Sequence, residues 1–296
     1  MVLFILGKKG GGVGKFLSEI EGENFEIWEV EKGGFPEISG YEAVVINGYF
    51  KNLNPESISV PKFFFFHGLR ALSRRMVFGG FEKNPLNLYK LLKFKKWVKK
   101  FDGWLAPSFS MAEMCNKFYG INPYVVHIGL DFNKLPNPKG LNRERALLWV
   151  GRNAWIKGVD RFLKLVDITG YEGWVIGLEG KDKKNVKFFG YVEDLSQFYE
   201  RAYALIVSSY YESFSLTALE ALYYNTPVIT FKTSGGVWEI LQMLGLYDYG
   251  FDSLEEMAEY IKGGIKPPNA NLEYFSIQNA KNRLKKALGV LMRGAQ

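Results

Sequence analysis

The sequence predicts an α/β protein built from two doubly wound parallel sheets of the Rossmann-like kind. Short apolar segments alternate with helical ones along the whole chain, which is typical of βαβ units. The length of 296 residues suffices for two domains of about 150 residues each. Residues 133–140 contain two prolines, two asparagines and a glycine, a composition typical of a linker. We therefore predict domains at 1–136 and 137–296 that face each other across a cleft.

Each domain is expected to contain six strands. In the first domain they are predicted at residues 2–6, 25–30, 43–46, 62–66, 104–107 and 124–126. In the second domain they are predicted at residues 147–150, 174–176, 186–188, 205–207, 228–230 and 247–249. Residues 280–291 are predicted to be helical.

The composition excludes several classes of protein. A hydrophobic content of 47% with 16% aromatic residues indicates packed cores rather than disorder. No apolar run approaches the roughly 20 residues of a membrane span, and residues 1–7 lack the layout of a signal peptide, so we expect a cytoplasmic protein. The single cysteine, Cys115, excludes an internal disulfide and a thiolate metal cluster.

Residues 203–224 are predicted to form a buried strand, a sharp turn and a helix. The helix would begin at Phe214, Ser215 and Leu216, where free N–H groups favour an anion such as a phosphate. Glu212 and Glu220 bracket this turn, and two carboxylates beside an anion site suit contacts with sugar hydroxyls. An alternative for Glu220 is a capping box with Thr217.

The spacing Glu, seven residues, Glu, with Ala-Leu and then Pro-Val-Ile behind it, resembles the nucleotide-sugar signature of retaining GT-B glycosyltransferases of family 4. The family commonly has Pro-Ser, Gly and Gly where this chain has Ser208-Ser209, Ser215 and Asn225-Thr226. The resemblance implies a GT-B fold whose last helix, at about 280–292, crosses back to the first domain. It also implies that Glu220 holds the ribose and Glu212 the donor sugar.

A second motif follows the first strand of the second domain. Gly151-Arg152 and Lys157-Gly158 combine a planar guanidinium with a mobile ammonium, which suits a diphosphate clamp. Two exposed basic residues without a ligand are the alternative. Family 4 enzymes carry Gly-Arg and Lys-Gly at this spacing and bind the donor's β-phosphate with both side chains. Gly190, Tyr191 and Val192 resemble the family's nucleobase-holding loop, in which backbone groups do the reading.

The glycine-rich residues 7–15 support more than one hypothesis. They resemble the phosphate loop of ParA-type ATPases, but Phe16 stands where a magnesium-binding hydroxyl is needed. By resemblance to family 4, Gly11 and Gly12 would bring bare backbone against the donor diphosphate. A flexible turn is the third possibility.

His67 follows a strand with four phenylalanines, and open α/β sheets bind ligands at that edge. It matches the family's cleft histidine, which lies near the donor sugar. A packing or capping role is the alternative.

These motifs together predict a hexosyltransferase that uses a nucleotide-diphosphate sugar and retains the anomeric configuration. The sequence lacks an Asp-x-Asp motif between strands, the motif that would indicate a bound divalent ion. Arg152, Lys157 and the helix N-terminus could neutralise the leaving diphosphate instead. We expect no cofactor and no metal site. A ParA-like ATPase and a non-catalytic nucleotide-sugar-binding subunit are the alternatives.

The basic charge is concentrated in the first domain. Residues 1–140 carry a net charge of +6 and residues 141–296 a net charge of +1. Residues 86–101 hold six lysines beside apolar residues at helical spacing, a pattern typical of helices that dock on anionic bilayers. We therefore expect peripheral membrane attachment and a lipid-linked or other saccharide acceptor, but no nucleic acid, because no binding module accompanies the charge. The alternative is a core-packed helix with a solvated basic face.

Overall fold

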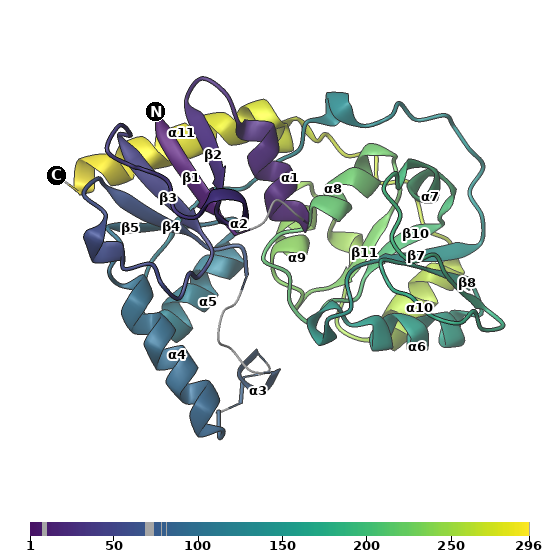
Figure 1. Ribbon diagram of the computed structural model, residues 1–296. Helices are drawn as coiled ribbons and strands as arrows, with labels where there is room; N and C mark the ends of the chain where they lie inside the picture. The colour runs from purple at the N-terminus through teal and green to yellow at the C-terminus, as the bar shows by residue number, and fades with distance from the viewer. Residues whose placement is uncertain (8–10, 69–73, 78, 81, 296) are drawn as a thin grey trace. The chain divides into compact units, whose positions relative to one another are not determined.

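A computed structural model describes residues 1–295 except 8–10, 69–73, 78 and 81 (Figure 1). The chain divides into two compact units, unit 1 with residues 1–130 and 275–296 and unit 2 with residues 131–274. Each unit contains a six-stranded sheet in which all neighbouring strands are parallel. The α/β fold class is therefore confirmed.

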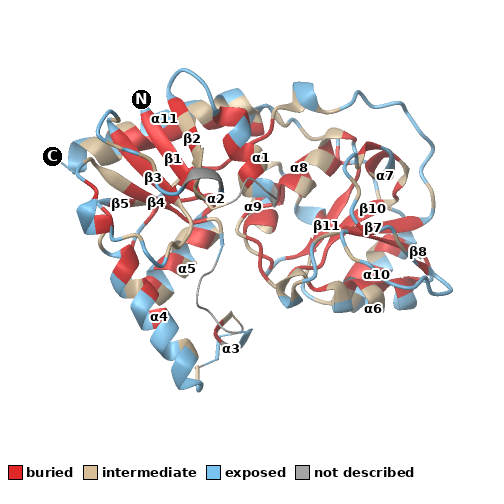
Figure 2. Ribbon diagram, viewed as in Figure 1, coloured by how far each residue is buried: buried red, intermediate tan, exposed pale blue. Residues whose placement is uncertain are grey.

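The sheet of unit 1 has the order β2-β1-β3-β4-β5-β6. Its strands are β1 Val2–Leu6, β2 Phe25–Glu29, β3 Ala43–Asn47, β4 Lys62–Phe65, β5 Gly103–Ala106 and β6 Tyr124–Val125. Every residue of the interior strand β1 is buried, as expected for a parallel strand covered on both faces. Figure 2 shows the burial concentrated along this sheet. The predicted strands of the first domain match these six to within one residue at each end.

The helices of unit 1 are α1 Gly11–Ile20, α2 Val30–Gly33, α3 Arg74–Val77, α4 Pro85–Val98, α5 Phe109–Tyr119 and α11 Ile277–Gly294. The chain enters unit 2 at Asp131 and returns to unit 1 at Phe275, so α11 packs within unit 1. The Arg283 guanidinium on α11 donates two hydrogen bonds, of 3.1 and 3.0 Å, to the carbonyl of His127. The backbone of buried His127 thus anchors this helix.

The sheet of unit 2 has the order β12-β11-β10-β7-β8-β9. Its strands are β7 Ala146–Val150, β8 Glu172–Ile176, β9 Val186–Phe188, β10 Ala204–Val207, β11 Val228–Phe231 and β12 Gly250–Phe251. Its helices are α6 Val159–Thr169, α7 Ser196–Arg201, α8 Leu216–Tyr223, α9 Gly236–Met243 and α10 Leu254–Gly263.

One predicted strand of the second domain is wrong. Residues Tyr247–Tyr249 form a single turn of 3-10 helix, and the sixth strand is the shorter β12 directly after it. The two tyrosines at alternate positions imitate the period of a strand. Only Tyr249 is directed inward, where its hydroxyl donates to the carbonyl of Lys266 at 2.7 Å.

The predicted linker is held against unit 2. The carboxylate of buried Glu200 accepts hydrogen bonds from the N–H groups of Lys139 and Leu141, at 2.7 and 3.3 Å. The Tyr224 hydroxyl donates to the carbonyl of Pro136 at 2.8 Å. This proline- and asparagine-rich segment therefore has fixed contacts with α7 and with the end of α8.

Candidate functional site

The site in unit 2 lies where the strand order reverses. From β7 the chain proceeds to β8 and β9 on one side, whereas β10, β11 and β12 lie on the other side. The loops after β7 and β10 therefore leave the sheet in different directions although the strands are neighbours. Ligands of open α/β sheets bind outside the carboxyl ends of the strands at such a switch point. Arg152 and Lys157 follow β7, and Glu212 follows β10, so three predicted site residues lie there.

The two loops approach each other so closely that one position must be glycine. Gly158 has a φ of +63°, and a Cβ there would lie 2.1 Å from the carbonyl oxygen of Ser208. The Ser208 hydroxyl donates to the Gly158 carbonyl at 2.7 Å, and the Tyr210 N–H donates to the Ile156 carbonyl at 2.8 Å. These contacts fix the turn that carries Lys157 against the turn that carries Glu212.

Lys157 and Glu212 form an ion pair across the switch point. The Lys157 ammonium lies 2.5 Å from Glu212 Oε1, and the Ser209 hydroxyl donates to the same oxygen at 2.7 Å. The Glu212 backbone pairs with the loop after β11, because its N–H donates to Ser234 O and its carbonyl accepts from Gly236 N, at 2.9 and 2.8 Å. The Glu212 side chain is 11% exposed, and its carboxylate is held by Lys157 and Ser209 while the backbone is held by the loop after β11.

Arg152 begins the same loop as Lys157 and is exposed to solvent. The two predicted clamp residues therefore differ in their environment. Lys157 forms an ion pair with a carboxylate, whereas Arg152 is exposed to water. A planar guanidinium that remains solvated can bind an incoming phosphate without breaking an internal ion pair.

A row of backbone contacts continues the site toward β9. The Gly151 N–H donates to the Ile176 carbonyl at 3.0 Å, and the Gly177 N–H donates to the Gly190 carbonyl at 2.6 Å. Gly177 has a φ of +89°, and a Cβ on it would lie 2.4 Å from the Gly151 carbonyl oxygen. Predicted residues Gly151 and Gly190 are therefore linked through Gly177, which the sequence analysis missed. Its position directly after the buried strand β8 is the sequence feature that could have indicated it.

The predicted base loop continues from Gly190 into solvent. Tyr191 is 85% exposed, and Val192 is half-buried. An aromatic ring with this much free surface can stack on a planar ligand.

The helix after β10 begins within the predicted residues Phe214 to Leu216. Ser215 is the N-cap of α8, and its hydroxyl accepts a hydrogen bond from the Ala218 N–H at 3.3 Å. Phe214, Ser215 and Leu216 are all buried. The capping-box alternative for Glu220 is wrong, because the cap is Ser215 rather than Thr217 and the third helical residue is Ala218.

Glu220 is positioned by a residue that sequence reasoning missed. The hydroxyl of Tyr199 on α7 donates to Glu220 Oε2 at 2.8 Å. Burial, reinforced by the Glu220 charge, raises the pKa of Tyr199 well above 10, so the phenol stays a hydrogen-bond donor. Its ring stacks on Tyr224 with centroids 5.9 Å apart. No spacing in the sequence connects a tyrosine on one helix with a carboxylate on the next.

In unit 1, His67 lies beside Asn47, the last residue of β3. His67 Nε2 is 3.0 Å from Asn47 Oδ1, and the imidazole packs 4.2 Å from the Phe65 ring. The burial of the ring lowers the pKa of His67 to about 3, so it is neutral at physiological pH. Asn47 was not predicted as a site residue. The sequence feature that could have indicated it is its position at the end of β3, the strand that pairs with the one before His67.

The glycine-rich segment after β1 is described in part. Lys8, Lys9 and Gly10 lie outside the described residues, while Gly11 and Gly12 are the first two residues of helix α1. Phe16 on α1 is completely buried and belongs to the core. Over the part of the chain that is described, no group of three or more His, Cys, Asp or Glu side chains could hold a metal ion.

Comparison with known proteins identifies the part of the chain that carries this site. Residues 131–262 match the family model described as "Glycosyl transferases group 1". These residues are similar to a glycosyltransferase domain. This domain contains β7 to β11 and therefore Arg152, Lys157, Glu212 and Glu220.

A sequence relative and two solved structures add to this comparison. The chain is 30% identical over 149 residues to an uncharacterized glycosyltransferase of Methanocaldococcus jannaschii, an alignment that covers 42% of this chain and 37% of the relative. The chain thus spans well under half the length of that relative. Two solved structures resemble nearly the whole fold. Anabaena HepE, solved with UDP and glucose, gives a TM-score of 0.70 at 15% identity, covering 98% of this chain and 99% of HepE. AviGT4, a glycosyltransferase of Avilamycin A biosynthesis, gives a TM-score of 0.66 at 13% identity, covering 99% and 98%.

These similarities confirm the GT-B fold that the sequence predicted. The Glu-x7-Glu signature predicted a glycosyltransferase. The family match over residues 131–262 favours this prediction over the ATPase hypothesis.

Proposed function

We propose that the protein is a retaining glycosyltransferase of the family 4 type that takes its sugar from a nucleotide-diphosphate donor without a metal ion. The observation that carries this proposal is the Lys157–Glu212 ion pair at the switch point of the glycosyltransferase domain. A lysine and a carboxylate fixed there suit a ligand with an anionic diphosphate next to a polyhydroxylated sugar.

Arg152 and Lys157 would bind the diphosphate. Negative charge develops on the leaving phosphate as the glycosidic bond breaks, and preorganised cations aimed at that charge lower the barrier. The backbone at the beginning of α8 adds the positive end of a helix dipole. Three positive groups can thus serve where other enzymes use a divalent ion.

The two glutamates would hold the two ends of the donor. Glu220, oriented by Tyr199, is proposed to accept hydrogen bonds from the ribose hydroxyls. Glu212, oriented by Ser209 and Lys157, is proposed to accept them from the transferred sugar. Gly190, Tyr191 and Val192 would face the base, and Gly11 and Gly12 remain candidates for the diphosphate. His67 is the catalytic candidate of unit 1, where its neutral imidazole can share a proton with a sugar hydroxyl.

The proposed transfer takes place on one face of the sugar. The bond from the anomeric carbon to the phosphate oxygen breaks, the acceptor hydroxyl oxygen bonds to that carbon from the same side, and its proton passes to the departing phosphate. Configuration is therefore retained, and no protein nucleophile is required.

The acceptor is proposed to be lipid-linked, with helix α4 on an anionic membrane surface. The C-terminal half of α4 packs into unit 1 through Leu91, Phe94, Trp97 and Val98. The N-terminal half exposes large apolar residues, Leu86 at 58%, Leu88 at 43%, Tyr89 at 60% and Leu92 at 56%. Exposed Lys83, Lys90, Lys93 and Lys96 stand among them. Figure 2 shows this half of α4 as an exposed projection of unit 1.

Exposed apolar side chains among lysines favour a membrane surface over a merely solvated basic face. Docking would bury the apolar groups, and each nearby lysine contributes roughly 1 kcal/mol of attraction to an anionic leaflet. None of the described helices combines the length and the apolarity needed to cross a bilayer.

The activity is tested by incubating the protein with UDP-, GDP- and ADP-sugars and, separately, with ATP, each in EDTA. We expect slow hydrolysis of one sugar nucleotide, with the released sugar keeping its anomeric configuration by NMR. ATP hydrolysis alone would support the ATPase, and binding without turnover would support a non-catalytic subunit. A strict requirement for Mg²⁺ or Mn²⁺ would contradict metal-free transfer.

Membrane docking is tested by co-sedimentation with anionic and neutral vesicles at low salt. We expect the protein to pellet with anionic vesicles, and replacing Leu86, Tyr89 and Leu92 together by Gln should abolish this. Equal pelleting with both vesicle types, or no loss in the triple variant, would refute the docking surface.

A further inference from the structure

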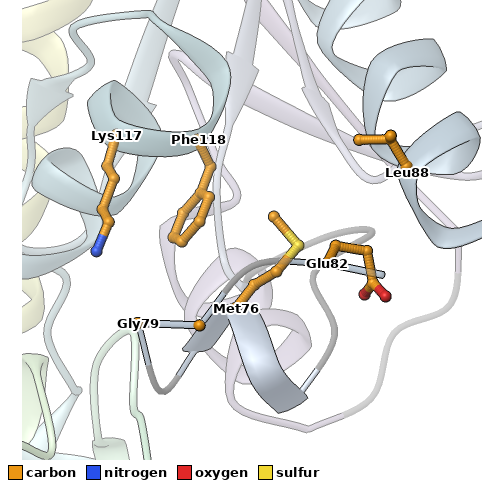
Figure 3. Close-up of a pocket in the computed structure, with 7 residues that line it drawn as sticks. Met76, Gly79, Glu82, Leu88, Lys117 and Phe118 are labelled. Atoms are coloured by element: carbon orange, nitrogen blue, oxygen red, sulfur yellow. The ribbon is translucent and has the colours of Figure 1, made fainter. Parts of the chain in front are cut away.

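A cavity of about 380 Å³ lies between helices α3, α4 and α5 of unit 1 (Figure 3). Met76 of α3, Leu88 of α4 and Phe118 of α5 supply its apolar walls. Figure 3 shows Met76 and Phe118 directed toward the cavity from different elements. Gly79 and Gly80 also line it. The volume falls within the range of about 300 to 1,000 Å³ that small-molecule sites occupy.

The lining indicates a hydrocarbon ligand. A thioether, an aliphatic chain and an aromatic ring adapt to a flexible chain, and methionine fits varied shapes because it is unbranched and polarizable. Met76 is buried even though the cavity beside it is open, so the apolar lining continues inward from the surface. Leu88 belongs both to the cavity and to the exposed apolar half of α4. Leu88 therefore connects the cavity with that exposed apolar half of α4.

The charged groups at the rim favour an anionic head group. Exposed Lys117 lines the cavity, with its ammonium 5.4 Å from the centre of the Phe118 ring. The acidic lining residue, Glu82, is occupied by the beginning of α4, because its two oxygens accept from the Asn84 N–H and the Asn87 amide at 2.7 and 3.3 Å. Lys83 adds a second exposed cation next to it. The solvent-facing charge at this place is therefore positive.

We infer that this cavity binds one hydrocarbon chain of the lipid acceptor, with the anionic phosphate of that lipid at Lys117. The inference rests on the proposed function, in which the acceptor is a membrane lipid. It adds a specific chain site to what would otherwise be a non-selective contact between α4 and the bilayer.

The test uses dioctanoyl phosphatidic acid, a water-soluble anionic lipid, in the absence of vesicles. We expect saturable binding by calorimetry, weakened at least tenfold in Met76→Glu, which places a charge in the apolar cavity. Lys117→Gln should weaken it at least threefold while binding of the uncharged dioctanoylglycerol stays within twofold. Val290→Gln is the matched control: it removes an exposed apolar residue of α11 that does not line the cavity, and binding should stay within twofold.

Labelling of wild-type protein avoids dependence on the folding of any variant. A phosphatidic acid with a diazirine at the chain end should label the peptides that contain Met76, Leu88 or Phe118. Labelling spread along α4, or confined to other helices, would overturn the inference, as would phosphatidic acid binding that Met76→Glu leaves unchanged. Donor hydrolysis by the wild-type protein needs no lipid, so it tests the proposed function separately. Donor hydrolysis without labelling of the cavity peptides would reject the site for the hydrocarbon chain but would still support the proposed glycosyltransferase activity.

Discussion

The two units share one architecture but differ in what they bury beside their sheets. Among the described residues, unit 2 buries ten polar or charged side chains, whereas unit 1 buries three. Six of the ten lie on or directly after β10 and β11: Ser208, Ser209, Glu212, Ser215, Thr230 and Ser234. They bond to one another and to nearby backbone, as when Ser234 donates to the Ser209 carbonyl and Thr230 to the Val207 carbonyl, at 2.7 and 2.8 Å.

Unit 1 instead packs aromatic rings beside its sheet. Phe64 contacts Phe66, Phe94, Trp97 and Phe101 with ring centroids 4.7 to 6.0 Å apart. Aromatic packing stabilises a scaffold without specifying a polar ligand, whereas buried polar groups must be hydrogen-bonded and so have fixed positions. The difference teaches that the polar groups around the switch point of unit 2 have fixed positions, whereas unit 1 supplies a scaffold with apolar and basic surfaces.

The largest effect is expected from the charged groups of unit 2. Arg152→Ala should slow transfer a hundredfold or more, about 3 to 4 kcal/mol, because it removes a cation aimed at the leaving phosphate. Arg152 is exposed, so the midpoint of thermal unfolding should not change. Glu212→Gln should reduce kcat more than nucleotide affinity. The matched control is Lys187→Ala, which removes a lysine that is paired with Glu172 on the surface. Rates within threefold of wild type for Arg152→Ala would reject the phosphate assignment.

Two glycines test how tightly the loops of the two units are held. Gly158→Ala should destabilise the protein by about 2 kcal/mol or more, because its backbone is left-handed and a Cβ would collide with the Ser208 carbonyl. Gly68, directly after His67, has no atom within 4 Å of an added Cβ, so Gly68→Ala should stay within about 0.5 kcal/mol. Denaturant titration measures both. Equal losses would mean that the switch-point loops are no more constrained than the loop after β4.

His67 gives unit 1 a pH dependence. The residue is half-buried by surface area, yet the burial of its ring lowers its pKa to about 3, against about 6.5 in the unfolded chain. The unfolded state therefore binds more protons below pH 6.5, and stability should fall as the pH drops toward 3. Between pH 7 and pH 5 the loss should reach up to about 2 kcal/mol more in wild type than in His67→Gln. The same loss in both proteins would exclude His67 as its source.

A smaller effect is expected from Tyr199, which orients Glu220. Tyr199→Phe should weaken nucleotide binding about tenfold, since a hydrogen bond to a charged group contributes roughly 1.5 to 3 kcal/mol. For a nucleotide with a deoxyribose, the difference in affinity between the variant and the wild type should nearly disappear, because the orientation of Glu220 matters through the ribose hydroxyls. Tyr224→Phe is the control, since its hydroxyl donates to the backbone carbonyl of Pro136. If both variants bind nucleotide alike, Tyr199 has only a packing role.

The sequence predicted what depends on local pattern. Eleven of the twelve strands were placed because their apolar runs end at turn residues, and the error at Tyr247–Tyr249 arose where two aromatics imitate strand period. The residue types at the switch point were also predicted, because they belong to motifs near strand ends. Their pairing was not: Lys157 and Glu212 are 55 positions apart in the sequence. Tyr199, Ser209 and Asn47 act through contacts that only the folded chain creates.

Donor binding at the switch point of unit 2 is the central proposal. The deciding measurement is the thermal unfolding of wild type, Arg152→Ala and Glu220→Gln in EDTA with UDP-, GDP- and ADP-sugars. A donor at a hundred times its Kd stabilises the folded state by about 2.7 kcal/mol, so one of these sugars should raise the unfolding temperature of wild type by about 5 °C or more. Both variants should lose most of that shift at the same concentration. The absence of a shift with all three sugars, or equal shifts in wild type and both variants, would contradict the account.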